Sequence, residues 1–390
     1  MSSSVSLPTP ESLAAARWFG GKAGAIGRIE ECDRLDMGGG AALSILRVDG
    51  ADLYVWSEGA AASALLRSGS DPERGLWQFR DAGVTLPAGA EERSIGLDQS
   101  NTSYVVGERL VVKLYRRIWP GVHPEVELGR HLTETAHLDC VPAFAGSLHW
   151  DGHAVALVQE YVPGEDGWAW GAAAVQAGDV SDIARLGAES ARLHAALRGY
   201  GSSDATAADL AGWRQAARDQ LDAAIAAVPG DVAAELCDLR PRIVAELDAL
   251  ATPAEPVTLQ RLHGDLHIGQ VLRAGDGRLV VVDLEGEPTK PVEERSRPGP
   301  ALRDVAAMLR SFDHLGRYVA RDVDPGCDVD GWIARAREAF LAAYGPVDTG
   351  LLRALEVEKE TYEFTYAAAF LPEWMYAPVG GMRWLMEHDG

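Results

Sequence analysis

The hydrophobic pattern of the chain changes once, near residue 180, and this change constrains the fold more than any other feature. Before it, short apolar runs alternate with turn signals such as Gly38-Gly39-Gly40 and Asp49-Gly50, which predicts small antiparallel strands. After it, apolar residues recur at helical spacing, as at Ile183, Leu186 and Leu193. The pattern therefore predicts an α+β fold, with a small β-rich lobe followed by a large, mostly helical lobe.

We expect three parts along this chain of 390 residues. Residues 1–92 are expected to form an N-terminal cap of short strands with one short helix. Residues 93–165 form a second β-rich part, and residues 166–390 form the helical lobe. Within the helical lobe, a strand pattern returns only over Leu262–Leu272 and Arg278–Leu284.

Composition and charge exclude several classes of protein. The net charge of −22 repels phosphate backbones and anionic membranes, so neither is expected as the main partner. Apolar runs end well short of the roughly 20 residues that a bilayer crossing needs. Met1–Pro10 lacks the basic and apolar regions of a signal peptide. The four cysteines lie far apart without paired spacing, which is typical of a reduced, cytoplasmic chain without a zinc site.

The stretch from Gln260 to Pro288 carries the polar residues that most restrict the chemistry. Asp265 follows His263-Gly264, Gln270 comes five residues later, and Asp283 follows Gln270 by thirteen, at the end of an apolar run. Asp265 on a tight loop can accept a proton from a substrate hydroxyl. A hairpin would bring the amide of Gln270 and the carboxylate of Asp283 to one divalent cation, and phosphoryl transfer needs such a set. The alternative is a surface hairpin with polar loop residues and no chemistry.

Lysine is rare in this chain, so a lysine within a strand pattern is informative. The chain has 32 arginines but only four lysines, and Lys113 lies in the apolar run Val111–Leu114. A lysine buried on a strand is costly unless an acid or a phosphate pairs with it. The alternative is a lysine on the exposed face of the strand.

A second polar segment lies near the C-terminus. On a helix, Lys359, Tyr362, Glu363 and Tyr366 would fall close to one face, at steps of three and four residues, and Trp374 follows. Aromatic faces can stack on the C–H groups of a sugar, while carboxylates accept hydrogen bonds from its hydroxyls. The alternative is an amphipathic helix whose tyrosines border the core.

Several motifs together resemble the bacterial maltokinases and the actinobacterial glucosamine kinases, an aminoglycoside-phosphotransferase-like group of the protein-kinase-like superfamily. The resemblance covers nearly the whole chain and is carried by RWFGGK (17–22), QSNTSYVV (99–106), KLYRRIWPGVHPEVEL (113–128), HGDLHIGQVLR (263–273), DLEGEP (283–288), VEER (292–295) and ALRDVAAMLRSFD (301–313). It implies a bilobal protein-kinase-like fold, with residues 93–165 binding the nucleotide. It also implies ATP and Mg²⁺ as cofactors and phosphate transfer to a sugar.

The resemblance assigns roles to the residues of the central loop. Asp265 is implied to be the catalytic residue. Gln270 stands where the superfamily usually has Asn as a metal ligand, and Asp283 is implied to be the second ligand. Glu285 is either a further metal ligand or a residue that supports one.

The resemblance also implies where the nucleotide is held. Lys113 would contact its phosphates, with Glu127 on the following helix as the expected partner and Glu125 as the next choice. A turn replaces the glycine-rich loop of protein kinases and would bind phosphate through backbone N–H groups and small hydroxyls, at Ser100, Asn101, Thr102 and Ser103. The linker between the lobes would hydrogen-bond adenine through its backbone, at Gln159, Glu160, Tyr161 and Val162.

The resemblance further implies a sugar acceptor. The residues expected to contact it are His267, Arg310, Asp313, Glu360, Glu363, Tyr366 and Trp374. His267 either contacts the sugar or orients the loop. Maltokinases tend to follow the Tyr-Glu of this helix with a second acid and an Arg/Asn-rich turn. This chain has Tyr366-Ala367-Ala368-Ala369-Phe370-Leu371 there, which disfavours a disaccharide site.

We therefore predict an ATP-dependent kinase that converts glucosamine to glucosamine 6-phosphate, because an ammonium group suits a pocket with Glu363 and nearby acids. The alternatives are a maltokinase that makes maltose 1-phosphate, an aminoglycoside phosphotransferase, and a non-catalytic sensor of nucleotide or sugar. The expected partner is a small sugar, glucosamine or maltose, with neither nucleic acid nor membrane. The chain is expected to be a monomer or a homodimer in the cytoplasm.

Overall fold

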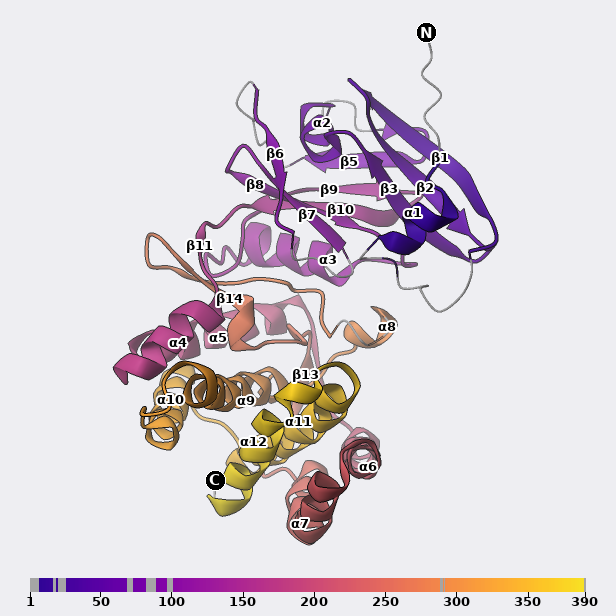
Figure 1. Cartoon of the computed structure of the whole chain (residues 1–390). Coiled ribbons are helices and arrows are strands. Elements are labelled where there is room, and N and C mark those ends of the chain that lie inside the picture. Colours follow the sequence, from indigo (N-terminus) through magenta and orange to yellow (C-terminus); the bar gives the residue numbers. More distant parts are fainter. Residues whose placement is uncertain are drawn as a thin grey trace. The chain divides into compact units, whose positions relative to one another are not determined.

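The computed structural model of the chain describes residues 7–16, 19, 26–68, 73–81, 89–96, 101–287, 290 and 292–388. The chain forms two compact units, Met1–Val162 and Pro163–Gly390, and each is considered by itself. The first unit is rich in strands and the second in helices (Figure 1), which confirms the predicted α+β fold. No helix among the described residues is both long enough and apolar enough to cross a membrane.

The first unit contains two antiparallel sheets. The smaller has the order β1-β2-β3 and consists of β1 (Ile29–Gly38), β2 (Ala41–Val48) and β3 (Asp52–Glu58). The larger has the order β4-β5-β9-β10-β8-β7-β6 and consists of β4 (Glu73–Arg74), β5 (Trp77–Asp81), β6 (Glu92–Ser94), β7 (Asn101–Val106), β8 (Leu110–Tyr115), β9 (Phe144–Trp150) and β10 (His153–Glu160). The helices are α1 (Pro10–Ala15), α2 (Ala61–Ser68) and α3 (Pro124–Arg130), and a π-helical turn over His131–Thr135 continues α3.

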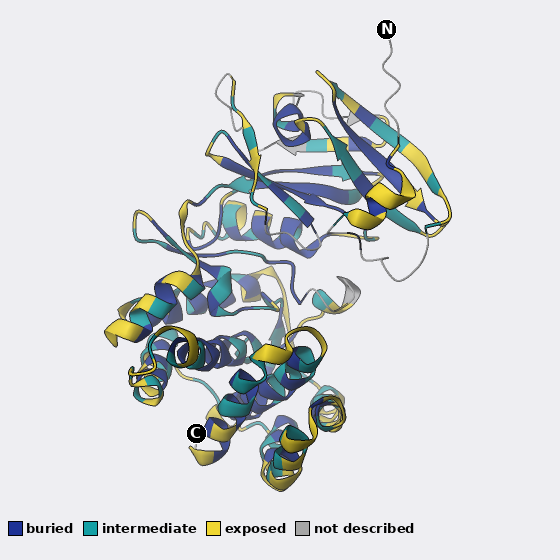
Figure 2. Cartoon of the chain, viewed as in Figure 1, coloured by how far each residue is buried: buried dark blue, intermediate teal, exposed yellow. Residues whose placement is uncertain are grey.

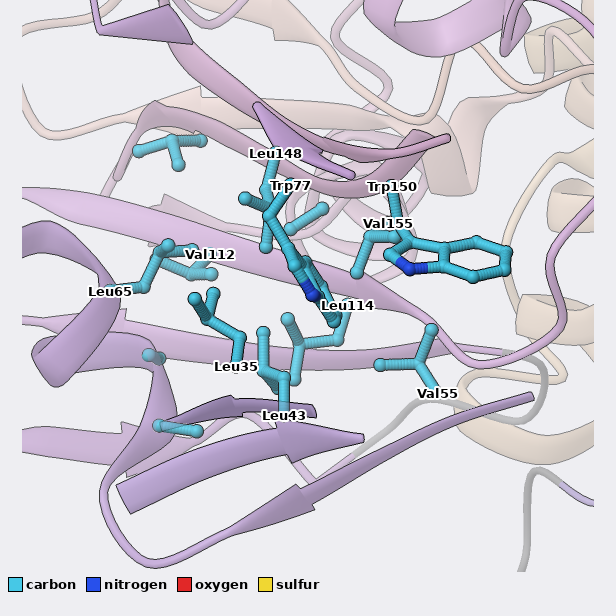
Figure 3. Packing of buried hydrophobic residues seen from close by; sticks show 14 of the residues in the cluster. Leu35, Leu43, Val55, Leu65, Trp77, Val112, Leu114, Leu148, Trp150 and Val155 are labelled. Atoms are coloured by element: carbon cyan, nitrogen blue, oxygen red, sulfur yellow. The ribbon is translucent and has the colours of Figure 1, made fainter. Parts of the chain in front are cut away.

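The two sheets of the first unit share one apolar core (Figure 3). Leu43 and Val55 enter it from the smaller sheet, and Val112 and Leu114 enter it from β8 of the larger sheet. Leu65 of α2 packs into the same cluster. Each fully buried Leu or Val contributes about 1.5–3 kcal/mol relative to an exposed one, so this core holds β8 firmly in place.

The predicted division into three parts stays a prediction. The boundary between the two compact units falls after Val162, close to the expected one at residue 165. Strand β5 precedes the expected boundary at residue 92, yet it pairs with β9 in the larger sheet. The first 92 residues therefore supply strands to both sheets.

The second unit is mostly helical. Its helices are α4 (Gly167–Ala177), α5 (Ser181–Tyr200), α6 (Ala207–Ala227), α7 (Gly230–Asp248), α8 (Val292–Arg295), α9 (Leu302–Tyr318), α10 (Val329–Tyr344), α11 (Thr349–Phe370) and α12 (Tyr376–Glu387). Its strands form two small sheets, one of β11 (Gly164–Glu165), β14 (Val271–Ala274) and β15 (Leu279–Val281), the other of β12 (Ser202–Asp204) and β13 (Thr258–Gln260).

Helix α9 is the central element of the second unit. It packs against α10, α11 and α12, and nearly all of its residues from Asp304 to Gly316 are buried. Figure 2 shows this helix as an almost continuous dark blue ribbon. Polar side chains on a helix that is buried all round need hydrogen-bond or ionic partners, so the partners of its polar residues are described below.

One predicted strand is wrong. The stretch Leu262–Leu272 was expected to be a strand, but residues 261–267 are an irregular loop, Ile268–Gln270 form one 3₁₀ turn, and β14 begins only at Val271. The reason is that several backbone N–H groups of this loop donate to side chains of α9 and not to a neighbouring strand. The same irregular backbone carries Asp265.

Candidate active site

The loop that carries Asp265 is anchored by Asp304, in the first turn of α9. Its Oδ2 accepts the N–H of His263 at 2.8 Å, and its Oδ1 accepts the N–H of Gly264 at 3.0 Å. His194 of α5 places Nε2 3.2 Å from the same Oδ2. Burial by itself would raise the pKa of Asp304, but the hydrogen bond and charge of His194, with the N–H of Gly264, lower it, so the carboxylate stays ionised.

The tautomer of His263 follows from its two partners. Its Nε2 lies 2.9 Å from the carbonyl oxygen of Val282, which can only accept, so Nε2 carries the proton. Its Nδ1 then accepts the N–H of Asp265, at 3.3 Å. The ring thus connects the loop that carries Asp265 to Val282, the residue before Asp283.

Gln270 and Asp283 lie side by side, as their spacing predicted. Nε2 of Gln270 donates to Oδ2 of Asp283 at 3.3 Å, and the N–H of Val282 donates to the carbonyl of Gln270 at 2.9 Å. Asp283 has a positive φ of 68°, in the left-handed region that Asp tolerates better than most residues. Glu285 is buried, and its Oε2 lies 3.5 Å from Nη1 of Arg295. These are oxygen ligands of the kind that Mg²⁺ prefers.

A cavity of about 550 Å³ in the second unit opens beside Asp265. Small-molecule sites are commonly about 300–1,000 Å³, so it has the size of a ligand pocket. The predicted acceptor residues that line it are His267, Arg310, Glu363, Tyr366 and Trp374. They come from the catalytic loop, α9, α11 and the turn after α11.

Aromatic rings form one wall of this cavity. Trp374 lies 5.6 Å from Trp168 and 6.2 Å from Tyr318, measured between ring centroids, and all three line the cavity. Gly269 makes this possible, because a Cβ there would lie 2.8 Å from Nε1 of Trp168. The sequence interpretation named only Trp374. The other two belong to α4 and α9, and nothing local in the sequence indicates that these helices meet there.

Two predicted acceptor residues lie outside the cavity, which corrects the prediction. Asp313 and Glu360 are fully buried, and neither lines the cavity. The reason is helical phase: each lies one residue from a lining position, His314 or Lys359, and one residue is about 100° around a helix. Asp313 instead accepts from Nε of Arg317 at 2.6 Å.

The buried carboxylate of Glu360 supports the wall of the cavity from behind. Its Oε1 lies 2.9 Å from Nε2 of His314, and its Oε2 lies 3.6 Å from Nη1 of Arg310. Burial by itself would lower the pKa of His314, but the charge and hydrogen bond of Glu360, with the charges of Glu363 and Asp313, together raise it. Burial raises the pKa of Glu360 despite these cations. The two groups together therefore hold a proton more tightly than they would in water.

Lys359 is a cation of the cavity wall. Its Nζ lies 2.9 Å from Oε1 of Glu363 and 4.5 Å from the ring centroid of Tyr362. Burial would lower the pKa of Lys359, but Glu363 and Asp265 raise it well above its usual range. The charge of Lys359 in turn lowers the pKa of Glu363, against the effect of burial. The wall therefore presents a fixed ammonium and a fixed carboxylate.

His267 is held as a neutral ring. Its Nδ1 accepts the N–H of Gly269 at 3.1 Å, so the proton of the neutral ring is on Nε2. Nε2 lies 3.9 Å from Oδ2 of Asp265, which is too far for a direct hydrogen bond. Burial lowers the pKa of His267. Its side chain both caps the 3₁₀ turn and lines the cavity, so the two roles expected for it are compatible.

In the first unit, Lys113 pairs with Glu125, which corrects the choice of Glu127. Nζ of Lys113 lies 3.0 Å from Oε2 of Glu125, which also accepts from the hydroxyl of Tyr115 at 2.9 Å. Glu125 is 2% exposed, so its carboxylate needs a partner within reach, and Lys113 supplies the cation. Lys113 is 8% exposed, which excludes the alternative of an exposed strand lysine.

The other residues predicted to bind nucleotide fall on β7, on β10 and just after it. Ser103 lies opposite Lys113 in the register of β7 and β8 and is buried, as is Asn101. Thr102, with the opposite side-chain direction, accepts from Nε of Arg116 at 2.8 Å. Ser100 lies outside the described residues.

The predicted adenine linker has some of its backbone already engaged. The N–H of Glu160 donates to the carbonyl of Ala143, and the N–H of Tyr161 donates to that of Arg109, both at 2.8 Å. Gln159 pairs with Val111 across β10 and β8. An adenine contact through this segment therefore falls to its carbonyl groups and to Val162.

Comparison with known proteins agrees with these features. Residues 91–356 match the protein family described as "Phosphotransferase enzyme family". The chain belongs to the phosphotransferase enzyme family. The match spans the strand with Lys113, the loop with Asp265 and the α9 side of the cavity wall. It ends before the α11 residues of that wall, which begin at Lys359.

Within this phosphotransferase family, the chain is similar to glucosamine kinases. It is 36% identical to the glucosamine kinase of Streptacidiphilus jiangxiensis, over 88% of each chain. It is 33% identical to that of Mycolicibacterium smegmatis, over 92% of this chain and 98% of the other. A solved glucosamine kinase, in crystal form B, superposes with a TM-score of 0.79 at 31% identity, over 97% of this chain and 99% of the other. Another solved glucosamine kinase, in complex with glucosamine, ADP and inorganic phosphate, superposes with a TM-score of 0.78 at 31% identity, over 95% of this chain and 97% of the other.

Proposed function

We propose that the chain transfers the γ-phosphate of ATP to glucosamine and releases glucosamine 6-phosphate and ADP. The observation that carries this proposal is the cavity beside Asp265, whose wall combines carboxylates with aromatic rings. The similarity to a glucosamine kinase solved with glucosamine, ADP and inorganic phosphate supports the same substrates. The free thiols of all four cysteines favour the cytoplasm as the site of the reaction.

Asp265 is the residue that we assign to the acceptor hydroxyl. Its carboxylate accepts the hydroxyl proton, the hydroxyl oxygen bonds to the γ-phosphorus, and the bond from that phosphorus to the ADP oxygen breaks. The anchoring of its loop by Asp304 and His263 keeps the carboxylate in one position, which lowers the cost of reaching the reactive geometry. The neutral Nε2–H of His267 donates to the same hydroxyl or to its neighbour on the ring.

The ammonium group of glucosamine distinguishes it from neutral sugars. Glu363 carries a pKa lowered mainly by Lys359, so it is ionised and can accept from an ammonium. A charged hydrogen bond of this kind contributes about 1.5–3 kcal/mol, which corresponds to roughly ten- to a hundredfold preference for glucosamine over glucose.

Gln270 and Asp283 are the residues that we assign to Mg²⁺. The described residues contain no group of three His, Cys, Asp or Glu side chains that would hold a metal by themselves. Mg²⁺ is often bound by one or two carboxylates together with nucleotide phosphates and water, so a site with one carboxylate and one amide fits this ion. When bound, Mg²⁺ neutralises charge on the phosphates. In the first unit, Lys113, held by Glu125, is the residue that we assign to the phosphates of the nucleotide.

The test is the purified chain with ATP and Mg²⁺ and a panel of glucosamine, N-acetylglucosamine, glucose and maltose, with the phosphorylated product identified by NMR. We expect glucosamine 6-phosphate, with kcat/KM for glucosamine at least tenfold above that for glucose. Equal or faster turnover of maltose would replace the proposal with a maltokinase. Nucleotide binding without turnover of any sugar would favour a sensor.

A further inference from the structure

A second cavity, of about 630 Å³, also reaches Asp265 and has no role in the reaction described above. It lies within the second unit, between α6, the start of α9, α11 and the segment before α9. The two cavities share Asp265, Glu287, Ala307, Lys359 and Tyr362. The two cavities therefore adjoin at Asp265, the residue that we assign to the acceptor hydroxyl.

The far wall of this second cavity has the chemistry of a sugar site. Trp213 of α6 lines it, with the guanidinium carbon of Arg303 5.3 Å from the ring centroid. Nη1 of Arg303 lies 2.6 Å from Oε2 of Glu358, so the guanidinium is held in place beside the indole. An aromatic face next to fixed donors and acceptors suits the C–H and O–H groups of a saccharide ring.

The elements that carry this wall are well supported. Helix α6 begins with a reciprocal cap between Thr206 and Asp209 and packs along α11. Gln220 of α6 donates to the hydroxyl of Thr365 of α11 at 2.9 Å, one further tie between the two helices. Trp213 and Glu358 are thus presented by two joined helices and not by a loop, and sites on rigid elements hold their geometry better.

We propose that the second cavity binds a second saccharide ring, so that the acceptor class includes disaccharides in which glucosamine carries another sugar. This inference rests on the proposed function. The glucosamine ring occupies the first cavity, and the attached ring passes Tyr362 and Lys359 and stacks on Trp213. The attached ring lies on the α6 side, away from Ala367–Leu371 at the end of α11, whose apolar residues disfavour a disaccharide site there.

The experiment compares glucosamine with its β-(1→4)-linked dimer as acceptors for the whole chain with ATP and Mg²⁺. We expect both to be phosphorylated. We expect W213A to lower the ratio of kcat/KM for the dimer to kcat/KM for glucosamine about tenfold, the scale of a lost aromatic contact. W213F keeps an aromatic face and should keep this ratio within about threefold. R214A, at the neighbouring position outside both cavities, is the matched control and should leave the ratio unchanged.

The outcomes separate this inference from the proposed function. Turnover of glucosamine without turnover or binding of the dimer at millimolar concentration overturns the second site and leaves the proposed function standing. An equal loss for both acceptors in W213A also overturns it, because Trp213 would then act only on the fold. If neither sugar is phosphorylated, the proposed function itself fails. Melting temperatures identify any variant that is unfolded. If W213A is unfolded, the ratio for W213F and the binding of the dimer to the wild type decide whether the second cavity binds a sugar ring.

Discussion

Nζ of Lys359 lies 2.9 Å from Oε1 of Glu363, one turn further along α11, and both side chains face the cavity beside Asp265. The pair fixes one positive and one negative charge at the place where a sugar hydroxyl must lose a proton and an ammonium must be recognised. Each partner keeps the other ionised, as the raised pKa of Lys359 and the lowered pKa of Glu363 indicate. Substitutions of Lys359 can therefore be tested for an effect on kcat, while Glu363 is the residue assigned to the ammonium group.

The first prediction concerns Lys359. K359M removes the ammonium but keeps a long side chain, and we expect kcat to fall about 10²-fold, since loss of one preorganised charged donor has this scale. K359R keeps the charge and should retain more activity. Steady-state kinetics with glucosamine and ATP provide the measurement. A change confined to KM for glucosamine would place Lys359 in binding alone.

The second prediction concerns Asp265. D265N keeps the shape of the side chain but cannot accept the hydroxyl proton, so we expect turnover to fall at least 10²-fold, the lower bound for loss of a general base. Nucleotide affinity, measured by calorimetry with ADP and Mg²⁺, should stay within about threefold because Lys113, Gln270 and Asp283 are intact. Retained turnover would remove Asp265 from the proposed role.

The third prediction concerns Asp304, which anchors the loop that carries Asp265. D304A leaves the N–H groups of His263 and Gly264 and the ring of His194 without their acceptor. Each lost buried partner costs about 1–3 kcal/mol, so we expect unfolding in urea to show a loss of about 2–5 kcal/mol. The loop that carries Asp265 should also be held less firmly, so we expect kcat to fall more than the affinity for nucleotide. H194A is the matched control, since it keeps both loop hydrogen bonds. Equal kcat values for the two variants would show that the loop does not depend on Asp304.

Local patterns in the sequence predicted the parts of the site that are close in the chain. Gln270 and Asp283 meet because a hairpin joins them, and their spacing indicates this geometry. His263 ties the loop that carries Asp265 to the same hairpin. Residues that meet only through the tertiary fold were missed: Asp304 and Trp168 come from helices whose packing no spacing records. An acid in the first turn of an expected helix was the available signal for Asp304.

Helical phase explains the remaining errors in the predicted site. Glu127, Asp313 and Glu360 were chosen because they are acids in the right segments. The structure assigns the pairing with Lys113 to Glu125 and the cavity wall to His314 and Lys359, two or one residues away. A sequence gives the existence of a helix more reliably than its rotation, and one residue turns a side chain by about 100°. Partner choice across helices therefore needed the structure.

The last prediction concerns pH and the pair His314–Glu360. Both pKa values are raised in the folded chain, so the native state holds protons more tightly than the unfolded state does. For His314, the stabilisation is complete below the ordinary pKa of about 6.5 and is lost as the pH rises through the higher folded value. The variant H314Q/E360Q removes both titrating groups, so the stability difference between wild type and variant should shrink between pH 6 and pH 9. Urea unfolding at both pH values measures it. The single variant H314Q is the control. It leaves Glu360 buried without its partner His314, so we expect it to be less stable than the double variant at pH 9. A wild-type advantage that stays constant or grows with pH would contradict the raised pKa of His314.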